Sequence, residues 1–294
     1  MKILCADIGG TSIKAAVIED TGKTIEFKEA PTESVLGGSH VMKNLVKLLR
    51  TYEEDYDAIG ISTAGQVDSV KGEIIYANEN IPGYTGMKVK AMLEKEFSLP
   101  VKVENDVNCA ALGEAWFGAG ALSEDLICLT YGTGVGGSII LNRKVYGGES
   151  GIAGEFGHMV IHPGGRDCNC GKKGCYESYA SARVLVQEAM KMDPDCDNGR
   201  KLFQRIQAGD VLMTELLDAW AKEVSYGLVN IIHIFNPALI VLGGGVLEQD
   251  LAFEAIKEHT FSQIMDSFKN VKLVKASLGN KAGLLGAASL YLNS

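Results

Sequence analysis

Three glycine-rich turns, each following an apolar segment, constrain what this chain can fold into. They are Gly9-Gly10-Thr11, residues 132–137 and residues 243–245. A backbone without Cβ atoms can approach a phosphate group closely, and its N–H groups then donate to the phosphate oxygens. One such turn is explained equally well by hairpin geometry. Three of them, with Asp7 and Thr133 placed in or beside them, favour a site for a phosphorylated ligand.

Two common nucleotide-binding motifs do not account for these turns. The sequence contains no Gly-x-x-x-x-Gly-Lys-Ser/Thr segment, which the P-loop requires. Segment 132–137 lacks the spacing of the dinucleotide fingerprint, and an apolar segment typical of a strand follows it where that fingerprint needs a helix. The turn is therefore predicted to be the tip of a hairpin.

The apolar patterns predict strands alternating with helices, which is typical of an α/β protein. Strands are expected at 2–8, 12–18, 58–62, 100–104, 126–131, 138–141, 238–242 and 271–275, and helices at 40–51, 86–97, 107–117, 176–190, 210–235, 250–267 and 281–292. A strand, a glycine turn and a second strand occur near the start of each half. This repetition predicts two related domains, with a hinge at residues 118–120.

Size and charge limit the functions that the chain can have. A chain of 294 residues usually forms two domains. The net charge of −9 opposes binding to nucleic acid. No apolar run reaches the roughly 18 residues that span a bilayer, and the N-terminal segment does not have the pattern of a signal peptide. We therefore expect a cytoplasmic protein that binds neither nucleic acid nor membrane.

Three of the seven cysteines form a cluster. Cys168, Cys170 and Cys175 lie within eight residues, and the glycines between them permit a tight reversal of the chain. Clustered cysteines in a cytosolic chain usually bind metal. Three thiolates and one imidazole complete the tetrahedral shell of a structural zinc site. His158 and His162 are both near enough in sequence to be the fourth ligand.

The other cysteines are expected to have no chemical role. Cys5, Cys109 and Cys128 lie singly in apolar segments and are predicted to be buried thiols. Cys196 lies in a polar loop and is predicted to be exposed.

Asp106 lies between a predicted strand and a predicted helix. Aspartate at such a position is commonly an N-cap, and the residue taken alone is best explained in that way. A second role for such a carboxylate is that of a base that accepts a proton. The dipole of the following helix would favour the ionised form.

Taken together, these segments resemble the ROK family of sugar kinases and repressors, a branch of the actin-like ATPase superfamily, over essentially the whole chain. The matching motifs are Asp-Ile-Gly-Gly-Thr-Ser-Ile-Lys at 7–14, Glu-Asn-Asp-Val-Asn at 104–108, Gly-Thr-Gly-Val-Gly-Gly at 132–137, Gly-Glu-Phe-Gly-His at 154–158, Cys-Asn-Cys-Gly-Lys-Lys-Gly-Cys-Tyr-Glu at 168–177 and Gly-Gly-Gly-Val at 243–246. The cysteine-containing motif is the most specific of them.

The resemblance implies a two-domain α/β fold of the actin-like (ribonuclease H-like) type, with the nucleotide in the cleft between domains. Residues 1–118 would carry the sugar-binding loops and the catalytic aspartate. Residues 119–294 would carry the zinc loop and the adenosine site, and the C-terminal helix would pack back on the first domain. A homodimer is also expected.

The resemblance further implies the site residues. ATP would be bound by Asp7, Gly9, Gly10, Thr11, Lys14, Gly132, Thr133, Gly134, Gly136, Gly137, Gly243, Gly244 and Gly245, with Asp7 holding Mg²⁺ through water. Asp106 would be the base. The sugar would be bound by Gly65, Asn80, Asn105, Asp106, Glu155, His158 and Glu177. The structural Zn²⁺ would be bound by His158, Cys168, Cys170 and Cys175, so the resemblance selects His158 over His162.

The implied activity is ATP-dependent phosphorylation of the 6-hydroxyl of a hexose or hexoside, with glucose or a β-glucoside favoured. An N-acetylmannosamine kinase and a fructokinase are alternatives within the same class. Many relatives have Pro at the position of Ala64, and many glucose-specific relatives have Trp in the loop where this chain has Pro82-Gly83-Tyr84. Two other classes remain: a sugar-sensing repressor, disfavoured because Asp7 leaves no room for an N-terminal DNA-binding segment, and an actin- or chaperone-like ATPase.

Overall fold

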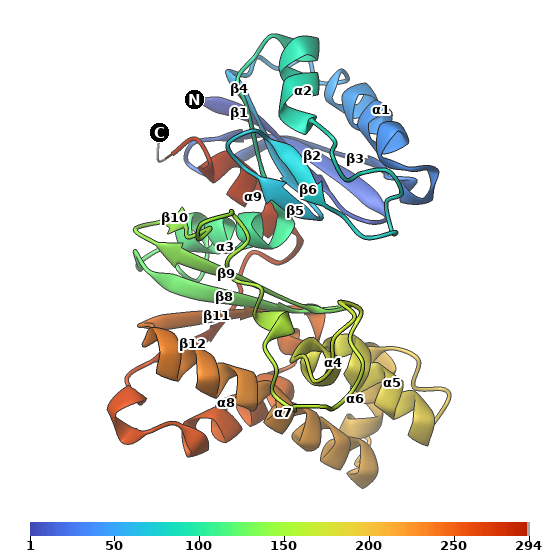
Figure 1. Cartoon of the computed structure of the whole chain (residues 1–294), viewed down its shortest axis with the longest axis vertical. Helices are drawn as coiled ribbons and strands as arrows, with labels where there is room; N and C mark the ends of the chain where they lie inside the picture. The colour runs from blue at the N-terminus through green and yellow to red at the C-terminus, as the bar shows by residue number, and fades with distance from the viewer. Residues whose placement is uncertain (293–294) are drawn as a thin grey trace. The chain divides into compact units, whose positions relative to one another are not determined.

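The computed structural model describes residues 1–292 (Figure 1). Two compact units make up the chain. Unit 1 contains residues 1–124, residues 138–153 and the C-terminal segment from Ser277, and unit 2 contains residues 125–137 and 154–276. A functional division of the chain at residues 118 and 119 stays a prediction.

A five-stranded sheet forms the centre of unit 1. Its order is β3 (Thr24–Pro31), β2 (Ser12–Glu19), β1 (Lys2–Ile8), β4 (Ala58–Thr63) and β7 (Val101–Asn105). β1 is antiparallel to β2 and parallel to β4, and β4 is parallel to β7. The parallel strands end at the same edge, which brings the residues that follow them together.

Both faces of this sheet are buried. Successive side chains of β1 point to opposite faces and so enter two different cores. Leu4 and Ala6 belong to a core that includes α1 (Gly38–Leu49) and α2 (Val89–Phe97). Ile3 and Cys5 belong to a second core that includes α3 (Asp106–Phe117) and α9 (Ala282–Ser289). A short hairpin of β5 (Gln66–Asp68) and β6 (Glu73–Tyr76) follows β4.

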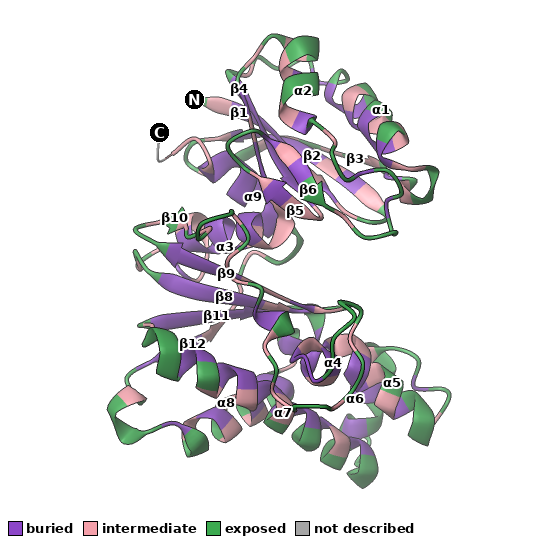
Figure 2. Cartoon of the chain, viewed as in Figure 1, coloured by how far each residue is buried: buried purple, intermediate pink, exposed green. Residues whose placement is uncertain are grey.

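The second five-stranded sheet repeats the strand order of the first. Its order is β10 (Lys144–Val145), β9 (Val135–Leu141), β8 (Leu126–Tyr131), β11 (Leu239–Gly243) and β12 (Lys272–Lys275). β8 is parallel to β11, and β11 is parallel to β12. In the first sheet β1 lies between β2 and the parallel strand β4. In the second sheet β8 lies in the same way between β9 and the parallel strand β11. Figure 2 shows the central strands of both sheets as buried.

Helices make up the rest of unit 2. They are α4 (Glu177–Ala180), α5 (Ala182–Met192), α6 (Gly199–Gln207), α7 (Val211–Phe235) and α8 (Asp250–Gln263). α7 packs against α4, α5, α6 and α8. Its buried residues, among them Trp220, Leu228 and Ile232, recur at helical spacing along one side.

Several predicted elements differ from the structure. The helix expected at 176–190 is two helices, because Ser181 is extended between them and its hydroxyl oxygen accepts the N–H of Val184 as an N-cap. β9 begins at Val135, inside the segment predicted as a turn. β3, β5, β6 and α6 were not predicted. Cys196 is 1% exposed, so the prediction of an exposed thiol was wrong.

The last helix packs tightly against α3 through glycines. A Cβ atom at Gly113 would lie 2.4 Å from the carbonyl oxygen of Ala282, and one at Gly286 would lie 1.7 Å from that of Cys109. The absence of side chains at these positions therefore lets α3 and α9 approach closely.

None of the helices in residues 1–292 combines the length and the apolar character needed to cross a bilayer.

Candidate functional site

The first glycine turn joins β1 to β2. The N–H of Gly9 donates to the carbonyl oxygen of Ser12 at 3.0 Å and closes the turn. Thr32 holds the turn from outside, because its hydroxyl donates to the carbonyl oxygen of Gly9 at 2.7 Å and its N–H donates to that of Thr11 at 3.0 Å. Gly10 and Thr11 remain exposed at the tip, where their polar groups are available to a ligand.

Asp7 lies at the end of β1, directly before this turn. The hydroxyl of Ser62, near the end of β4, donates to its Oδ1 at 2.6 Å. Lys14 is its register partner on β2. A Cβ atom at Gly283 in α9 would lie 2.8 Å from the carboxylate carbon of Asp7, so α9 closes one side of the site. Ser62 was not predicted, although its place at the end of the parallel strand beside β1 was a usable signal.

Asn105, and not Asp106, is the N-cap of α3. Its side-chain oxygen accepts the N–H groups of Val107 and Asn108. Its amide nitrogen donates to the carbonyl oxygen of Gly65 at 2.8 Å and to Oδ1 of Asp106 at 2.9 Å. The capping role considered for Asp106 is thus filled by its neighbour. The structure brings Gly65, Asn105 and Asp106 together.

The carboxyl of Asp106 is electrostatically unusual. Burial and, second to it, the nearby negative charge of Asp7 raise its pKa to about 6. These effects outweigh the hydrogen bond from the N–H of Val107, which lowers the pKa. Burial also raises the pKa of Asp7. A carboxyl with a pKa near 6 is still mostly ionised at pH 7, so it can accept a proton there.

The second and third glycine turns adjoin in unit 2. Gly132 donates its N–H to the carbonyl oxygen of Gly134 at 3.0 Å and accepts the N–H of Arg183 at 3.1 Å. Gly244 has a φ of +115°, and a Cβ atom there would lie 2.2 Å from the carbonyl oxygen of Tyr131. Only glycine therefore lets the turn after β11 lie directly against the end of β8.

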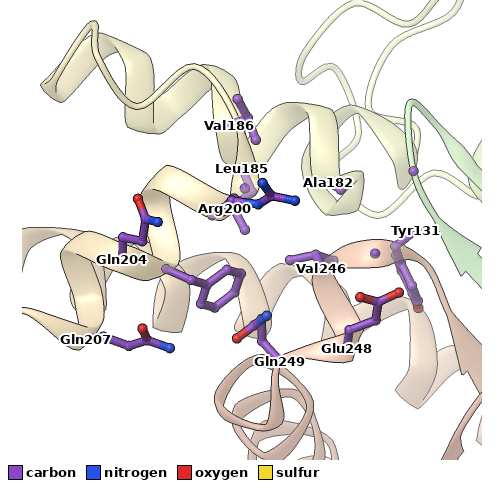
Figure 3. A pocket seen from close by; sticks show the side chains of 14 residues that line it. Tyr131, Ala182, Leu185, Val186, Arg200, Gln204, Gln207, Val246, Glu248 and Gln249 are labelled. Carbon is purple, nitrogen blue, oxygen red and sulfur yellow. The ribbon is translucent and has the colours of Figure 1, made fainter.

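A cavity of about 540 Å³ opens beside these two turns (Figure 3). It is lined by Tyr131, Gly132, Ala182, Leu185, Val186, Gly199, Arg200, Phe203, Gln204, Gln207, Gly245, Val246, Glu248 and Gln249. Of the predicted nucleotide-binding residues, only Gly132 and Gly245 line it. Five of the other lining residues come from α6, which was not predicted.

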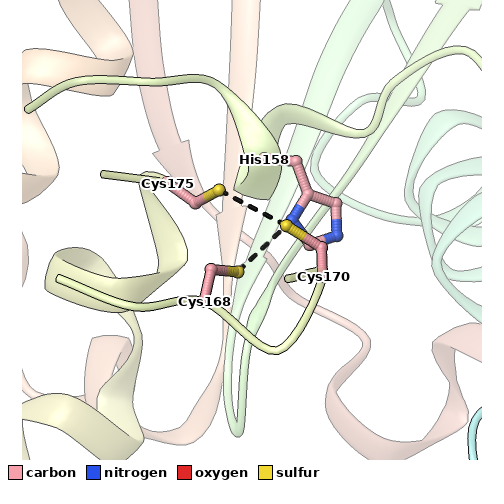
Figure 4. A group of neighbouring side chains, drawn as sticks. All are labelled: His158, Cys168, Cys170 and Cys175. Atoms are coloured by element: carbon pink, nitrogen blue, oxygen red, sulfur yellow. Dashed lines mark hydrogen bonds between the residues drawn. The ribbon is translucent and has the colours of Figure 1, made fainter. Parts of the chain in front are cut away.

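The cysteine cluster is assembled around His158 (Figure 4). One ligand atom from each of His158, Cys168, Cys170 and Cys175 lies within 4.8 Å of the others. Sγ of Cys168 lies 3.7 Å from Nδ1 of His158, and Sγ of Cys170 lies 3.6 Å from that of Cys175. In a tetrahedral zinc site with Zn–S bonds of about 2.3 Å, ligand atoms are about 3.8 Å apart. The four residues therefore fit a zinc ion.

His162 has a different environment. Its Nε2 lies 2.7 Å from a carboxylate oxygen of Glu223, and its ring contacts that of Tyr179 with 4.4 Å between centroids. His158 is therefore the histidine that the fold places with the cysteines.

Two glutamates adjoin the cluster. The thiol of Cys168 donates to Oε1 of Glu177 at 3.2 Å. A Cβ atom at Gly134 would lie 2.4 Å from the other oxygen of Glu177, so this carboxylate lies between the cysteine cluster and the second glycine turn. Oε2 of Glu155 lies 4.0 Å from Nε2 of His158, the ring nitrogen that does not face Cys168.

For the remaining predicted residues the structure shows fewer contacts that would indicate a role in binding. Thr133 is exposed at the tip of its turn. A Cβ atom at Gly137 would lie 2.3 Å from the ring of Phe156, which accounts for that glycine by packing. Asn80 is exposed, and its backbone N–H donates to the side chain of Asn78 in the same loop. Among the described residues, no hydrogen bond joins Asn80 to Asn105 or Asp106.

Comparison with known proteins identifies the family. The family model described as "ROK family" matches residues 3–294. A glucokinase of Thermotoga maritima is 31% identical over 99% of this chain and 97% of its own length. A beta-glucoside kinase of Klebsiella pneumoniae is 33% identical over 98% of this chain and 95% of its own.

A solved structure agrees with these matches. The ROK family glucokinase of Streptomyces griseus, in complex with glucose and AMPPNP, superposes with a TM-score of 0.86 and 32% identity, covering all of both chains. The predicted α/β fold of the actin-like type is thereby confirmed. This chain belongs to the ROK family.

Proposed function

We propose that the protein transfers the γ-phosphoryl group of ATP to a hydroxyl of a sugar. The observation that carries this proposal is the arrangement of Gly65, Asn105 and Asp106, in which a half-buried carboxylate is oriented by its neighbour at the start of α3. Relatives named glucokinase and beta-glucoside kinase, which match almost the whole chain, support it.

Asp106 acts as the base in this proposal. A sugar hydroxyl attacks poorly while it keeps its proton, and a carboxylate within hydrogen-bonding reach accepts that proton during attack. Asn105 keeps one oxygen of the carboxylate engaged at 2.9 Å, which leaves the other oxygen for the sugar. Gly65, Asn80, Glu155, His158 and Glu177 complete the proposed sugar contacts.

ATP is proposed to bind on the three glycine turns, with its nucleoside in the cavity beside α6. The N–H groups of Gly10 and Gly134 suit phosphate oxygens. Those of Gly9 and Gly132 close the turns that present them. Thr11, Lys14, Thr133, Gly136, Gly137, Gly243, Gly244 and Gly245 complete the proposed set. Asp7 would hold Mg²⁺ through water, and the bound ion would supply neutralisation of the phosphate charge.

The metal proposed for His158 and the three cysteines is zinc in a structural role. Four protein ligands leave no open position for catalysis. The loop that the ion would fix carries Glu177, so zinc is proposed to act on sugar binding by holding that side chain in place. Nε2 of His158 stays available beside Glu155.

The proposed acceptor is the 6-hydroxyl of glucose or of a β-glucoside. Many glucose-specific relatives have a tryptophan in the loop that contains Tyr84 here, and the side chain of Tyr84 is not placed to cover the sugar as such a residue would. Its side chain is fully buried and its hydroxyl lies 2.9 Å from that of Thr63. No large aromatic side chain from this position therefore covers the sugar loop. That favours acceptance of a sugar with a substituent. We further propose a cytoplasmic homodimer, as in the family.

The test is release of ADP, coupled to a spectrophotometric assay, with glucose, cellobiose, N-acetylmannosamine and fructose offered separately. Turnover that requires one of these sugars establishes the kinase and names its acceptor. ATP hydrolysis at the same rate with and without every sugar would contradict the proposal and favour an ATPase that acts on another partner.

A further inference from the structure

We propose that the phosphoryl-donor site discriminates weakly among nucleobases, so that GTP and ITP serve as donors alongside ATP. The inference rests on the proposed kinase function and concerns the class of donor that the cavity beside α6 accepts. It follows from a contrast between the walls of this cavity and its polar lining.

The walls are apolar and buried. Leu185 is 1% exposed, Phe203 is 6% exposed and Val246 is 8% exposed, and all three line the cavity. Apolar and aromatic side chains bind the face of a base, and every base presents such a face. This part of the site therefore contributes affinity without distinguishing adenine from guanine or hypoxanthine.

The polar side chains of the cavity are exposed or half-exposed, apart from Tyr131, which is buried and whose hydroxyl is engaged with that of Tyr176 at 2.9 Å. Figure 3 shows Gln204 and Gln207 extending from α6, and Glu248 and Gln249 from the short segment after β11. Gln204, Gln207 and Glu248 are exposed, as is Arg200 at the start of α6. Within residues 1–292 the structure records no side-chain hydrogen bond for any of these five residues, so no neighbour fixes the direction of their donors and acceptors.

Selection between purines depends on such fixed groups. Adenine presents an amino donor where guanine presents a carbonyl acceptor. A site rejects the wrong base strongly only when that base leaves a buried polar group unpaired. A glutamine amide can present either its oxygen or its nitrogen after rotation, and an exposed one can bind water instead. We therefore expect discrimination of about tenfold at most between purine donors.

The size of the cavity sets a second expectation. About 540 Å³ is within the usual range for a small-molecule site and exceeds the needs of one base. Pyrimidines have a smaller face and lose part of the apolar contact. CTP and UTP should consequently be poorer donors than any of the three purine nucleotides.

The experiment compares kcat/KM for ATP, GTP, ITP, CTP and UTP, with the acceptor sugar saturating and the sugar phosphate measured directly. GTP and ITP within about twentyfold of ATP, a margin that allows for the expected tenfold, support the proposal. A larger deficit for both overturns it and indicates an edge-reading, adenine-specific site.

A binding measurement separates this inference from the proposed function. A fluorescent ADP analogue is bound to the protein and displaced by ADP, GDP or IDP without any sugar present. Displacement by all three at similar concentrations supports weak selection even if no tested sugar is phosphorylated. Displacement by ADP alone, or failure of the analogue to bind, overturns it.

Variants test which part of the cavity acts. Phe203→Ala should lower kcat/KM about tenfold for every donor alike. Gln204→Ala and Gln207→Ala should each change the ATP to GTP ratio less than about threefold. Lys201→Ala is the matched control, because Lys201 lies on α6, pairs with Asp197 at 2.8 Å and does not line the cavity. A glutamine variant that changes the ratio by more than threefold would show that the edge of the base is read, and would overturn the proposal.

Discussion

The side-chain amide of Asn105 donates to the carboxylate of Asp106 at 2.9 Å while its oxygen caps the helix that Asp106 begins. One residue therefore fixes both the start of α3 and the orientation of the proposed base. The same amide nitrogen reaches the carbonyl oxygen of Gly65, so the loop after β4 is held to the same point.

Asp106→Asn should abolish sugar phosphorylation, with a loss of at least about a thousandfold in kcat, because an amide cannot accept the hydroxyl proton. Sugar binding, measured by calorimetry, should stay within a few-fold of the unchanged protein. The same variant should be more stable at pH 7.5, because the folded state raises the pKa of this carboxyl to about 6 and so penalises its ionised form. We expect a melting temperature a few degrees higher. Near-normal turnover in the variant would show that another group is the base.

The pH dependence of kcat/KM should have an acid limb near pH 6. Asp106 must be ionised to accept a proton, so activity should fall about tenfold per pH unit below that pKa. The stability contribution of the same group has the opposite sign. Its raised folded-state pKa destabilises the protein fully above pH 6, and this penalty is relieved as the pH falls from 6 towards 4. Glucose phosphorylation and thermal melts over pH 5–8 check both. A flat rate profile across this range would contradict the assignment.

Cys170→Ser should lower the zinc content from about one ion per chain to a small fraction of that value. Loss of the ion should raise the KM for sugar more than the KM for ATP, because Glu177 lies only two residues after the proposed ligand Cys175. Metal analysis of the purified protein and steady-state kinetics measure the two effects. Cys196→Ser is the control, since this buried thiol lies outside the cluster, and its zinc content should be unchanged. A zinc-free C170S protein with normal KM for sugar would refute the structural role.

The sequence predicted best those parts of the site that depend on local chemistry. A cysteine cluster and a glycine turn after an apolar strand can each be recognised from residues that are adjacent in the sequence. The choice between His158 and His162 needed the family resemblance, because spacing alone permits both. In the structure His158 lies with the cysteines, whereas His162 contacts Glu223, which is 61 residues further along the chain.

The cavity beside α6 could not be predicted for a similar reason. Gly199–Gln207 carries only three buried side chains, Leu202, Phe203 and Ile206, and so short an apolar pattern is a weak helix signal. Its role depends on where the chain places it beside Gly132 and Gly245, which come from distant segments. The contact of Ser62 with Asp7 likewise depends on the pairing of β4 with β1.

The side chain of Glu114 binds two of the segments that lead from unit 1 to unit 2. Its side chain is 1% exposed, and it accepts four hydrogen bonds, from the N–H groups of Ala119, Ser277 and Leu278 and from the hydroxyl of Ser277. Ser277 is the first residue after the last segment of unit 2, and Ala119 lies in the predicted hinge. One carboxylate therefore secures two connecting segments on unit 1.

Glu114→Gln should destabilise the protein by about 2–4 kcal/mol, because an amide nitrogen cannot accept the hydrogen bonds and leaves buried N–H groups unpaired. Glu114→Ala should cost more, since all four donors lose their acceptor. Urea unfolding measures the free energy, with Glu215→Gln on the exposed side of α7 as the control expected to stay within about 0.5 kcal/mol. Equal stability of the E114Q and control variants would mean that the carboxylate does not hold these segments. If stability falls while kcat and both KM values stay unchanged, Glu114 supports the fold without influencing the reaction.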